Sequence, residues 1–160
     1  MEDIWNITAL VVSVLSVLLS LYALRQATTK NTSDMYLFFI SQYAKEDMKL
    51  ALRKLKDIKR GVYRLEQWES DMKNNLPKAF EYDEARRLVK YFYDTLAYMK
   101  LEKLIEARFL RLICLEKGAW LFLDTVEAME KFFDSGYDKK PYAVIRDVCE
   151  NLRKEGCCPP

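Results

Sequence analysis

The sequence predicts an all-α protein with one N-terminal transmembrane helix followed by a compact helical bundle of four to five helices. Glycine and proline number only four each among 160 residues, and 51% of the residues are hydrophobic. This composition disfavours a turn-rich sheet protein and a disordered chain. An uncharged apolar run near the N-terminus precedes apolar residues at helical spacing. We therefore divide the chain into a transmembrane helix with its flanks (1–30), a helical domain (31–155) and a cysteine/proline tail (156–160).

The apolar run is long enough to cross a bilayer. No charged side chain lies between Asp3 and Arg25. As a helix rising about 1.5 Å per residue, Ile4 to Leu24 would span about 31 Å, which matches a hydrocarbon core of about 30 Å. A cleaved signal peptide is one alternative, but the chain begins with acidic rather than basic residues and no A-x-A cleavage site follows. A buried soluble helix is the other, and we interpret the run as a retained single-pass span.

The charges that flank this run predict its orientation. Glu2 and Asp3 precede it with no Lys or Arg, whereas Arg25, Lys30 and the dense basic run from Lys49 to Arg60 follow it. Because positively charged flanks tend to remain in the cytoplasm, we expect the C-terminal domain to be cytoplasmic.

A stripe of small residues follows one face of the predicted span. Small side chains let two helices approach closely, and serine hydroxyls can bond across such a contact. Alternatively, each serine is tolerated because its hydroxyl bonds back to its own helix. We interpret the stripe as a packing face for a helix of another transmembrane protein or of a second copy of the chain. Its residues are Asn6, Ala9, Ser13, Ser16, Ser20, Ala23 and Ala27.

Apolar periodicity predicts the helices of the domain. Cap residues at 32–34 and Gly61 bound the first expected helix. Further helices are expected over about 81–99, 101–117 and 120–133, and a last one has Pro141 in its first turn. The stretch 61–76 is ambiguous, because asparagines and Pro77 mark a break after it.

The dense basic run is a candidate for contacts with acidic lipid headgroups, because lysine and arginine close to a membrane are attracted to anionic lipids. The alternative is an ordinary solvated helix face, since Glu46 and Asp57 are interspersed. The net charge of +2 does not indicate a nucleic-acid partner. The candidate lipid contacts are Lys49, Arg53, Lys54, Lys56, Lys59 and Arg60.

The sequence carries no recognisable catalytic motif. It contains no histidine, the commonest general base and metal ligand. It also lacks the phosphate-loop, dinucleotide-binding and nucleophile-elbow motifs. Carboxylates recur at helical spacing, as exposed helix faces commonly carry them. We therefore expect no catalytic residue and no cofactor.

The four cysteines are the remaining candidates for chemistry. Cys114 lies in an apolar helical pattern and is expected in the core. Cys149, Cys157 and Cys158 cluster near the C-terminus, where they could serve a redox role. A zinc site of all four thiolates is an alternative, although no C-x-x-C pair is present. A cytoplasmic domain would keep its thiols free by default.

The stretch from Tyr91 to Met129 contains an aromatic–acidic pair (Tyr93, Asp94), a break, a helix, and Trp120 at the start of the next helix. This pattern resembles that of small prokaryotic single-span membrane-anchored helical proteins of unknown function. The resemblance implies the same architecture and no particular activity. At the break, Met99-Lys100-Leu101 stands where that family commonly has a glycine.

These features predict a non-catalytic, membrane-anchored accessory or assembly subunit. Its span would dock on another membrane helix, and its helical domain would meet a cytoplasmic partner. A membrane-tethered redox or metal-linked sensor that uses the C-terminal cysteines is one alternative. A small enzyme with a carboxylate or thiol centre is another. The expected surroundings are the bilayer, another transmembrane protein or a second copy, and acidic lipid, with no nucleic acid.

Overall fold

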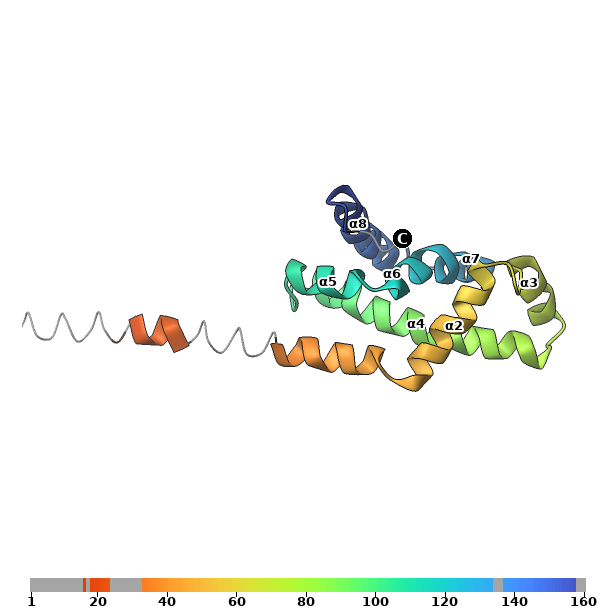
Figure 1. Ribbon diagram of the computed structural model, residues 1–160, viewed down its shortest axis with the longest axis horizontal. Coiled ribbons are helices and arrows are strands. Elements are labelled where there is room, and N and C mark those ends of the chain that lie inside the picture. The colour runs from red at the N-terminus through yellow and green to blue at the C-terminus, as the bar shows by residue number, and fades with distance from the viewer. Residues whose placement is uncertain (1–15, 17, 24–32, 134–136, 158–160) are drawn as a thin grey trace, which may run out of the picture. The chain divides into compact units, whose positions relative to one another are not determined.

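The computed structural model describes residues 16, 18–23, 33–133 and 137–157 (Figure 1). Every regular element among these residues is a helix, so the predicted all-α class is confirmed for them. The chain divides into two compact units, Met1–Phe39 and Ile40–Pro160, which are considered separately.

The first unit contributes short helical segments. Residues 16, 18–23 and 33–39 are helical, and the Ser20 hydroxyl donates a hydrogen bond to the Ser16 carbonyl oxygen at 2.9 Å. In the part of the chain that the structure describes, no helix combines the length and the apolar character that crossing a membrane requires. Most of the predicted span, Ile4 to Leu24, lies outside the described residues.

The second unit contains more helical elements than the four to five that the sequence predicted. The elements α6, η1 and α7 follow one another without a break, and η1 is a π-helical segment. The bounds are α2 Glu46–Lys59, α3 Leu65–Lys73, α4 Pro77–Leu101, α5 Ala107–Cys114, α6 Lys117–Leu121, η1 Phe122–Val126, α7 Glu127–Phe133 and α8 Lys140–Lys154.

Two of the expected helices were wrong in their extent. The helix expected up to Gly61 is interrupted before α2, because Lys45 adopts an extended conformation (φ −60°, ψ 147°). The helix expected over 101–117 is shortened to α5, because α4 continues to Leu101 and Lys103 then takes a left-handed conformation (φ 58°). Neither position carries a glycine or proline, the residues that most clearly mark a break in a sequence.

A shared ending terminates four of the helices. After α4, the N–H of Leu104 bonds to the Met99 carbonyl and that of Lys103 bonds to the Lys100 carbonyl. This is the Schellman pattern, in which a left-handed residue satisfies the last carbonyls of a helix. The residues that occupy this left-handed position are Gly61 after α2, Asn75 after α3, Lys103 after α4 and Gly156 after α8. The predicted role of Gly61 as a helix end is thus confirmed, and so is Pro141 in the first turn of α8.

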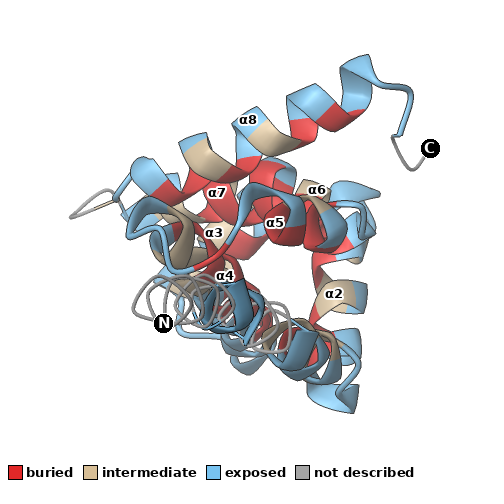
Figure 2. Cartoon of the chain, turned by 90° about the vertical axis from the view of Figure 1, so that its left-hand side faces the viewer, coloured by how far each residue is buried: buried red, intermediate tan, exposed pale blue. Residues whose placement is uncertain are grey.

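The core of the second unit forms around α4, which packs against α2, α3, α5, η1 and α8. Buried residues of these helices lie on the sides that face one another (Figure 2). An aromatic stack links three of the elements: Tyr93 of α4 stacks on Phe122 of η1 at 5.1 Å between ring centroids, and Phe122 stacks on Tyr142 of α8 at 4.4 Å. The sequence prediction that Cys114 belongs to the core is also confirmed.

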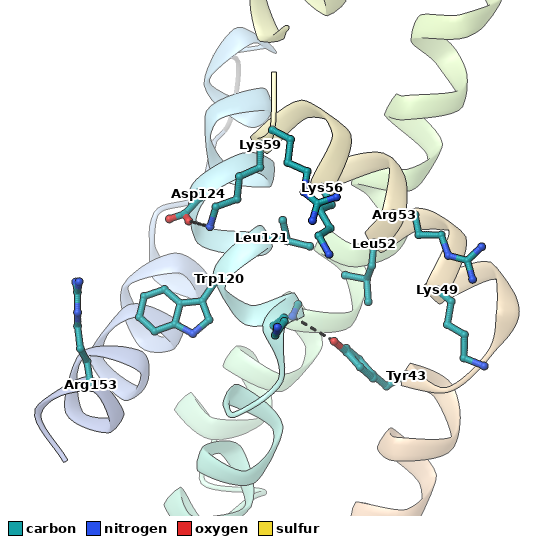
Figure 3. Close-up of a pocket in the computed structure, with 13 residues that line it drawn as sticks. Tyr43, Lys49, Leu52, Arg53, Lys56, Lys59, Trp120, Leu121, Asp124 and Arg153 are labelled. Atoms are coloured by element: carbon teal, nitrogen blue, oxygen red, sulfur yellow. Dashed lines mark hydrogen bonds and ion pairs between the residues drawn. The ribbon is translucent and has the colours of Figure 1, made fainter. Parts of the chain in front are cut away.

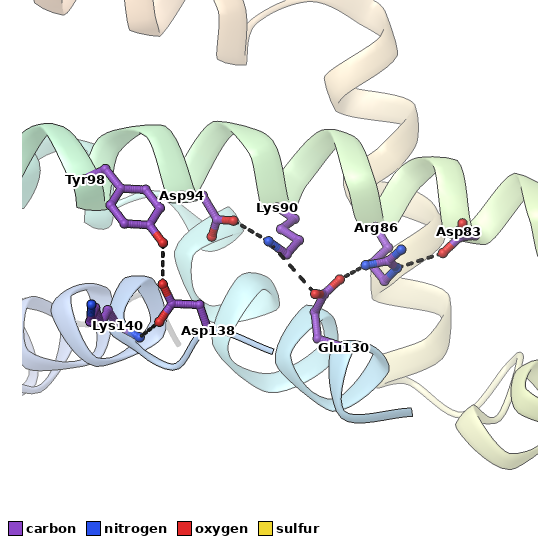
Figure 4. A network of polar contacts seen from close by, with 8 residues as sticks. All are labelled: Asp83, Arg86, Lys90, Asp94, Tyr98, Glu130, Asp138 and Lys140. Carbon is purple, nitrogen blue, oxygen red and sulfur yellow. Dashed lines mark hydrogen bonds and ion pairs between the residues drawn. The ribbon is translucent and has the colours of Figure 1, made fainter. Parts of the chain in front are cut away.

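A buried network of charges joins α4 to α7 (Figure 4). Arg86 Nε donates to Asp83 Oδ1 at 2.7 Å, and the same guanidinium forms an ion pair with Glu130. Lys90 lies between Glu130 and Asp94 and forms ion pairs with both. Burial raises the pKa of Asp94, and the neighbouring ammonium of Lys90 opposes that shift. Because each buried charge has an opposite charge beside it, the network crosses the interface without an isolated ion.

Arg86 and its neighbour Arg87 provide a matched pair for testing this network. Both contact Asp83, but the Arg86 side chain is 8% exposed and the Arg87 side chain is 70% exposed. Arg86→Leu leaves Glu130 and one oxygen of Asp83 without their main partner, so we expect it to lower the free energy of unfolding by about 3–5 kcal/mol. Arg87→Leu should cost about 1 kcal/mol or less, because solvent screens an exposed pair. Urea unfolding of both variants measures the difference, and equal losses would contradict the structural role of the buried network.

A candidate anion-binding pocket

A cavity of about 910 Å³ lies between α2 and the segment formed by α6 and η1, with α8 contributing one residue (Figure 3). Most of the basic lining comes from α2, and α6 contributes Lys117 together with aromatic and aliphatic side chains. The lining residues are Tyr43, Lys49, Leu52, Arg53, Lys56, Lys59, Arg60, Lys117, Gly118, Trp120, Leu121, Asp124 and Arg153.

The pocket has a strong excess of positive charge. Seven of its lining residues are lysine or arginine, and Asp124 is the single lining carboxylate. Asp124 pairs with Lys59, and Lys49 lies 3.8 Å from Glu46 outside the pocket lining. The other five basic side chains form no ion pair with another described residue: Arg53, Lys56, Arg60, Lys117 and Arg153. Like charges gathered on a concave surface focus a positive potential into it, which favours binding of an anion.

Helical periodicity places the basic residues of α2 on one face. Arg53, Lys56 and Arg60 follow one another at spacings of three and four residues, which puts them on the same side of a helix. The opposite side of α2 is buried through Met48, Ala51, Leu55 and Ile58. Packing of this apolar stripe against the core therefore turns the basic stripe towards the pocket.

The structure places only part of the predicted basic run in the pocket. Five of its six members line the pocket, whereas Lys54 projects elsewhere and pairs with Glu81 of α4 at 2.9 Å. Lys117 and Arg153, which sequence reasoning did not single out, complete the basic lining from α6 and α8. Neither lies near another pocket residue of α2 in the sequence, so only the tertiary fold brings them there.

The junction of α6 with the rest of the domain depends on a glycine. The N–H of Gly118 donates to the Tyr43 hydroxyl at 3.2 Å, and burial raises the pKa of Tyr43. A Cβ atom at position 118 would lie 2.7 Å from the Tyr93 hydroxyl and 2.8 Å from the Tyr43 hydroxyl. Glycine therefore allows the start of α6 to approach both tyrosines more closely than any other residue could.

The predicted packing stripe is only partly within the described residues. Ser16, Ser20 and Ala23 are helical and exposed, and the bond from Ser20 to the Ser16 carbonyl is the kind that the alternative interpretation requires. The other stripe residues lie outside the described part of the chain: Asn6, Ala9, Ser13 and Ala27. The packing face stays a prediction.

The cysteines predicted to act together lie in different surroundings. Cys149 is buried beside Cys114, and the hydrogen bond between the two thiols together with burial raises the pKa of Cys114. Cys157 is exposed, and Cys158 lies outside the described residues. Among the residues that the structure describes, no cluster of three or more histidine, cysteine, aspartate or glutamate side chains is suited to hold a metal ion.

The close contacts at Gly118 can be tested by measuring the stability of a variant with a side chain at this position. Gly118→Ala should lower the free energy of unfolding by about 1–3 kcal/mol, because the added methyl group overpacks a buried contact. This is the opposite of the gain of about 0.5–1 kcal/mol that alanine usually brings over glycine within a helix.

The hydroxyl of Tyr93 is the nearest atom to the added methyl group, so Tyr93→Phe should recover part of the loss. A double-mutant cycle measured by urea unfolding would give this coupling. An unaltered or increased stability of Gly118→Ala would show that the contact is not restrictive.

Comparison of the chain with models of protein families, with curated proteins and with solved structures finds no match. The resemblance of Tyr91 to Met129 to small membrane-anchored proteins therefore stays a prediction from the sequence. The basic pocket is the feature from which a function can be argued.

Proposed function

We propose that the helical domain is a binding module that takes up phosphate-bearing anions in its basic pocket. The observation that carries this proposal is the group of five basic side chains around one cavity that form no ion pair with another described residue. Bringing like charges together costs free energy unless an anion compensates them. A bound anion would relieve that repulsion.

Phosphate suits this lining better than a single carboxylate does. The guanidinium groups of Arg53, Arg60 and Arg153 can each present two parallel N–H donors to phosphate oxygens. The ammonium groups of Lys56 and Lys117 add point charges without a fixed direction. A ligand with more than one negative charge would engage several of these groups at once.

We further propose that Ile4 to Leu24 anchors the chain in a membrane, with the helical domain on the cytoplasmic side. The uncharged run and the basic residues that follow it support this proposal. The chain would then act as an accessory or assembly subunit, whose small-residue stripe contacts another transmembrane helix. In this setting the phosphate groups could come from acidic lipid headgroups or from a soluble ligand.

Charge reversal at Lys56 tests the pocket, with Lys54→Glu as the matched control. Lys54 belongs to the same helix and the same basic run, but it does not line the pocket. In the full chain held in non-ionic detergent, Lys56→Glu should weaken binding of tripolyphosphate about tenfold or more, since a hydrogen bond to a charged group contributes about 1.5–3 kcal/mol. Lys54→Glu should change it less than about threefold, because charges outside the pocket are screened.

Isothermal titration of these variants separates the two sources of phosphate. Dihexanoyl-phosphatidylglycerol represents the lipid, tripolyphosphate represents the soluble anion, and dihexanoyl-phosphatidylcholine is the uncharged control. Tighter binding of the acidic lipid would assign the pocket to headgroups. The proposal fails if neither anion binds, or if Lys54→Glu reduces binding as much as Lys56→Glu does.

The exposed cysteine offers a test of the orientation. Cys157 is exposed, whereas Cys114 and Cys149 are buried, so a thiol reagent applied to the folded chain should react first in the C-terminal tail. In spheroplasts that express the full chain, an impermeant maleimide should label it only after permeabilisation. The Cys157→Ser/Cys158→Ser variant measures the background. Strong labelling of intact spheroplasts would reverse the orientation.

A further inference from the structure

The basic pocket contains an aromatic ring that recognition of phosphate alone does not require. Trp120 of α6 is half-buried and lines the cavity on the side of α6 that lies towards Arg153, whereas Leu121 lies towards the basic stripe of α2 (Figure 3). Arg153 belongs to the same lining. The cavity therefore has a cationic side and a side that offers an aromatic face and aliphatic surface.

We propose that the ligand of this pocket is a nucleotide with several phosphates, whose base lies against Trp120 and whose phosphates lie along α2. This inference rests on the function proposed above and specifies the ligand. Every nucleobase has a π face that stacks on aromatic side chains, and an arginine guanidinium can add a cation–π contact. Arg153 is the lining residue of α8 placed to supply that charge.

The dimensions of the cavity agree with such a ligand. Its volume of about 910 Å³ lies in the upper part of the range of roughly 300–1,000 Å³ that is typical of small-molecule sites. A single phosphate would leave most of this space to water. A nucleoside triphosphate would fill more of it and would place its negative charges against the unpaired basic side chains.

The indole itself carries a further indication. The Trp120 Nε1 atom is buried and has no hydrogen-bond partner among the described residues. A buried indole N–H normally has an acceptor, and the absence of one calls for an explanation. The side chain is thus held by packing rather than by a polar contact.

The experiment compares ligands that carry the same phosphates with and without a base. ATP, GTP and tripolyphosphate are titrated in separate experiments, without divalent cations, into the full chain in non-ionic detergent. At least one of the two nucleotides should bind about tenfold more tightly than tripolyphosphate, because the base adds stacking that the inorganic anion lacks.

Variants at Trp120 test whether the ring causes this difference. Trp120→Leu should bring the nucleotides to the affinity that the same variant has for tripolyphosphate, and its circular dichroism spectrum should match that of the unaltered chain, which shows that the domain remains folded. Trp120→Phe retains an aromatic face, so it should preserve most of the preference.

The outcomes distinguish this inference from the proposed function. If tripolyphosphate or dihexanoyl-phosphatidylglycerol binds as tightly as both nucleotides, the nucleotide assignment is overturned and the phosphate-binding function stands. A nucleotide preference that persists in Trp120→Leu would overturn the placement of the base. If none of the anions binds, the proposed function itself fails and the inference fails with it.

Discussion

The close approach of Tyr43 and Tyr93 to Gly118 is the constraint on which the rest of the domain depends. It places the beginning of α6 against two tyrosines from other parts of the chain. Gly118 permits this contact because it has no side chain that would clash with the two hydroxyl groups. From this point the aromatic stack continues through Phe122 to Tyr142, so the same contact region orients η1 and α8. Tyr43 and Gly118 also line the pocket, so this contact lies at its edge.

The domain handles its charges in two contrasting ways. Between α4 and α7, the cations Arg86 and Lys90 are inserted among carboxylates, and each charge is compensated within the core. Beside α2, cations such as Lys56 and Lys117 gather around a cavity without comparable compensation. The small net charge of +2 hides this difference. The first arrangement holds helices together, while the second leaves binding capacity for a partner of opposite charge.

Sequence reasoning worked where local chemistry decides the structure. Pro141 marks the start of α8 and Gly61 the end of α2, because each residue has a backbone preference that acts without the rest of the fold. It failed at Lys45 and Lys103, whose backbone conformations no local preference of lysine would suggest.

Sequence reasoning likewise predicted only part of the pocket. The spacing of basic residues along α2 predicted a basic helix face. It did not show that Lys54 would lie outside the pocket and form an ion pair with Glu81. Nor could it reveal that Arg153, one hundred residues further along the chain, would line the same cavity as Arg53. Long-range packing determines both results.

The π-helical segment η1 has a consequence for how this chain tolerates changes in length. A π segment arises when a helix accommodates an extra residue, and it is costly compared with the regular α-helix. A related chain with one residue fewer between Phe122 and Val126 could run as an unbroken α-helix from α6 into α7 and keep its later residues in place, because the π segment already absorbs the extra residue. If the present chain straightened this segment without losing a residue, its later residues would be turned by about 100° about the helix axis. Met129, now buried, and Glu130, now paired with Arg86, would then leave the interior together. The wider turn of this segment keeps the two ends of the helix in register with their different surroundings.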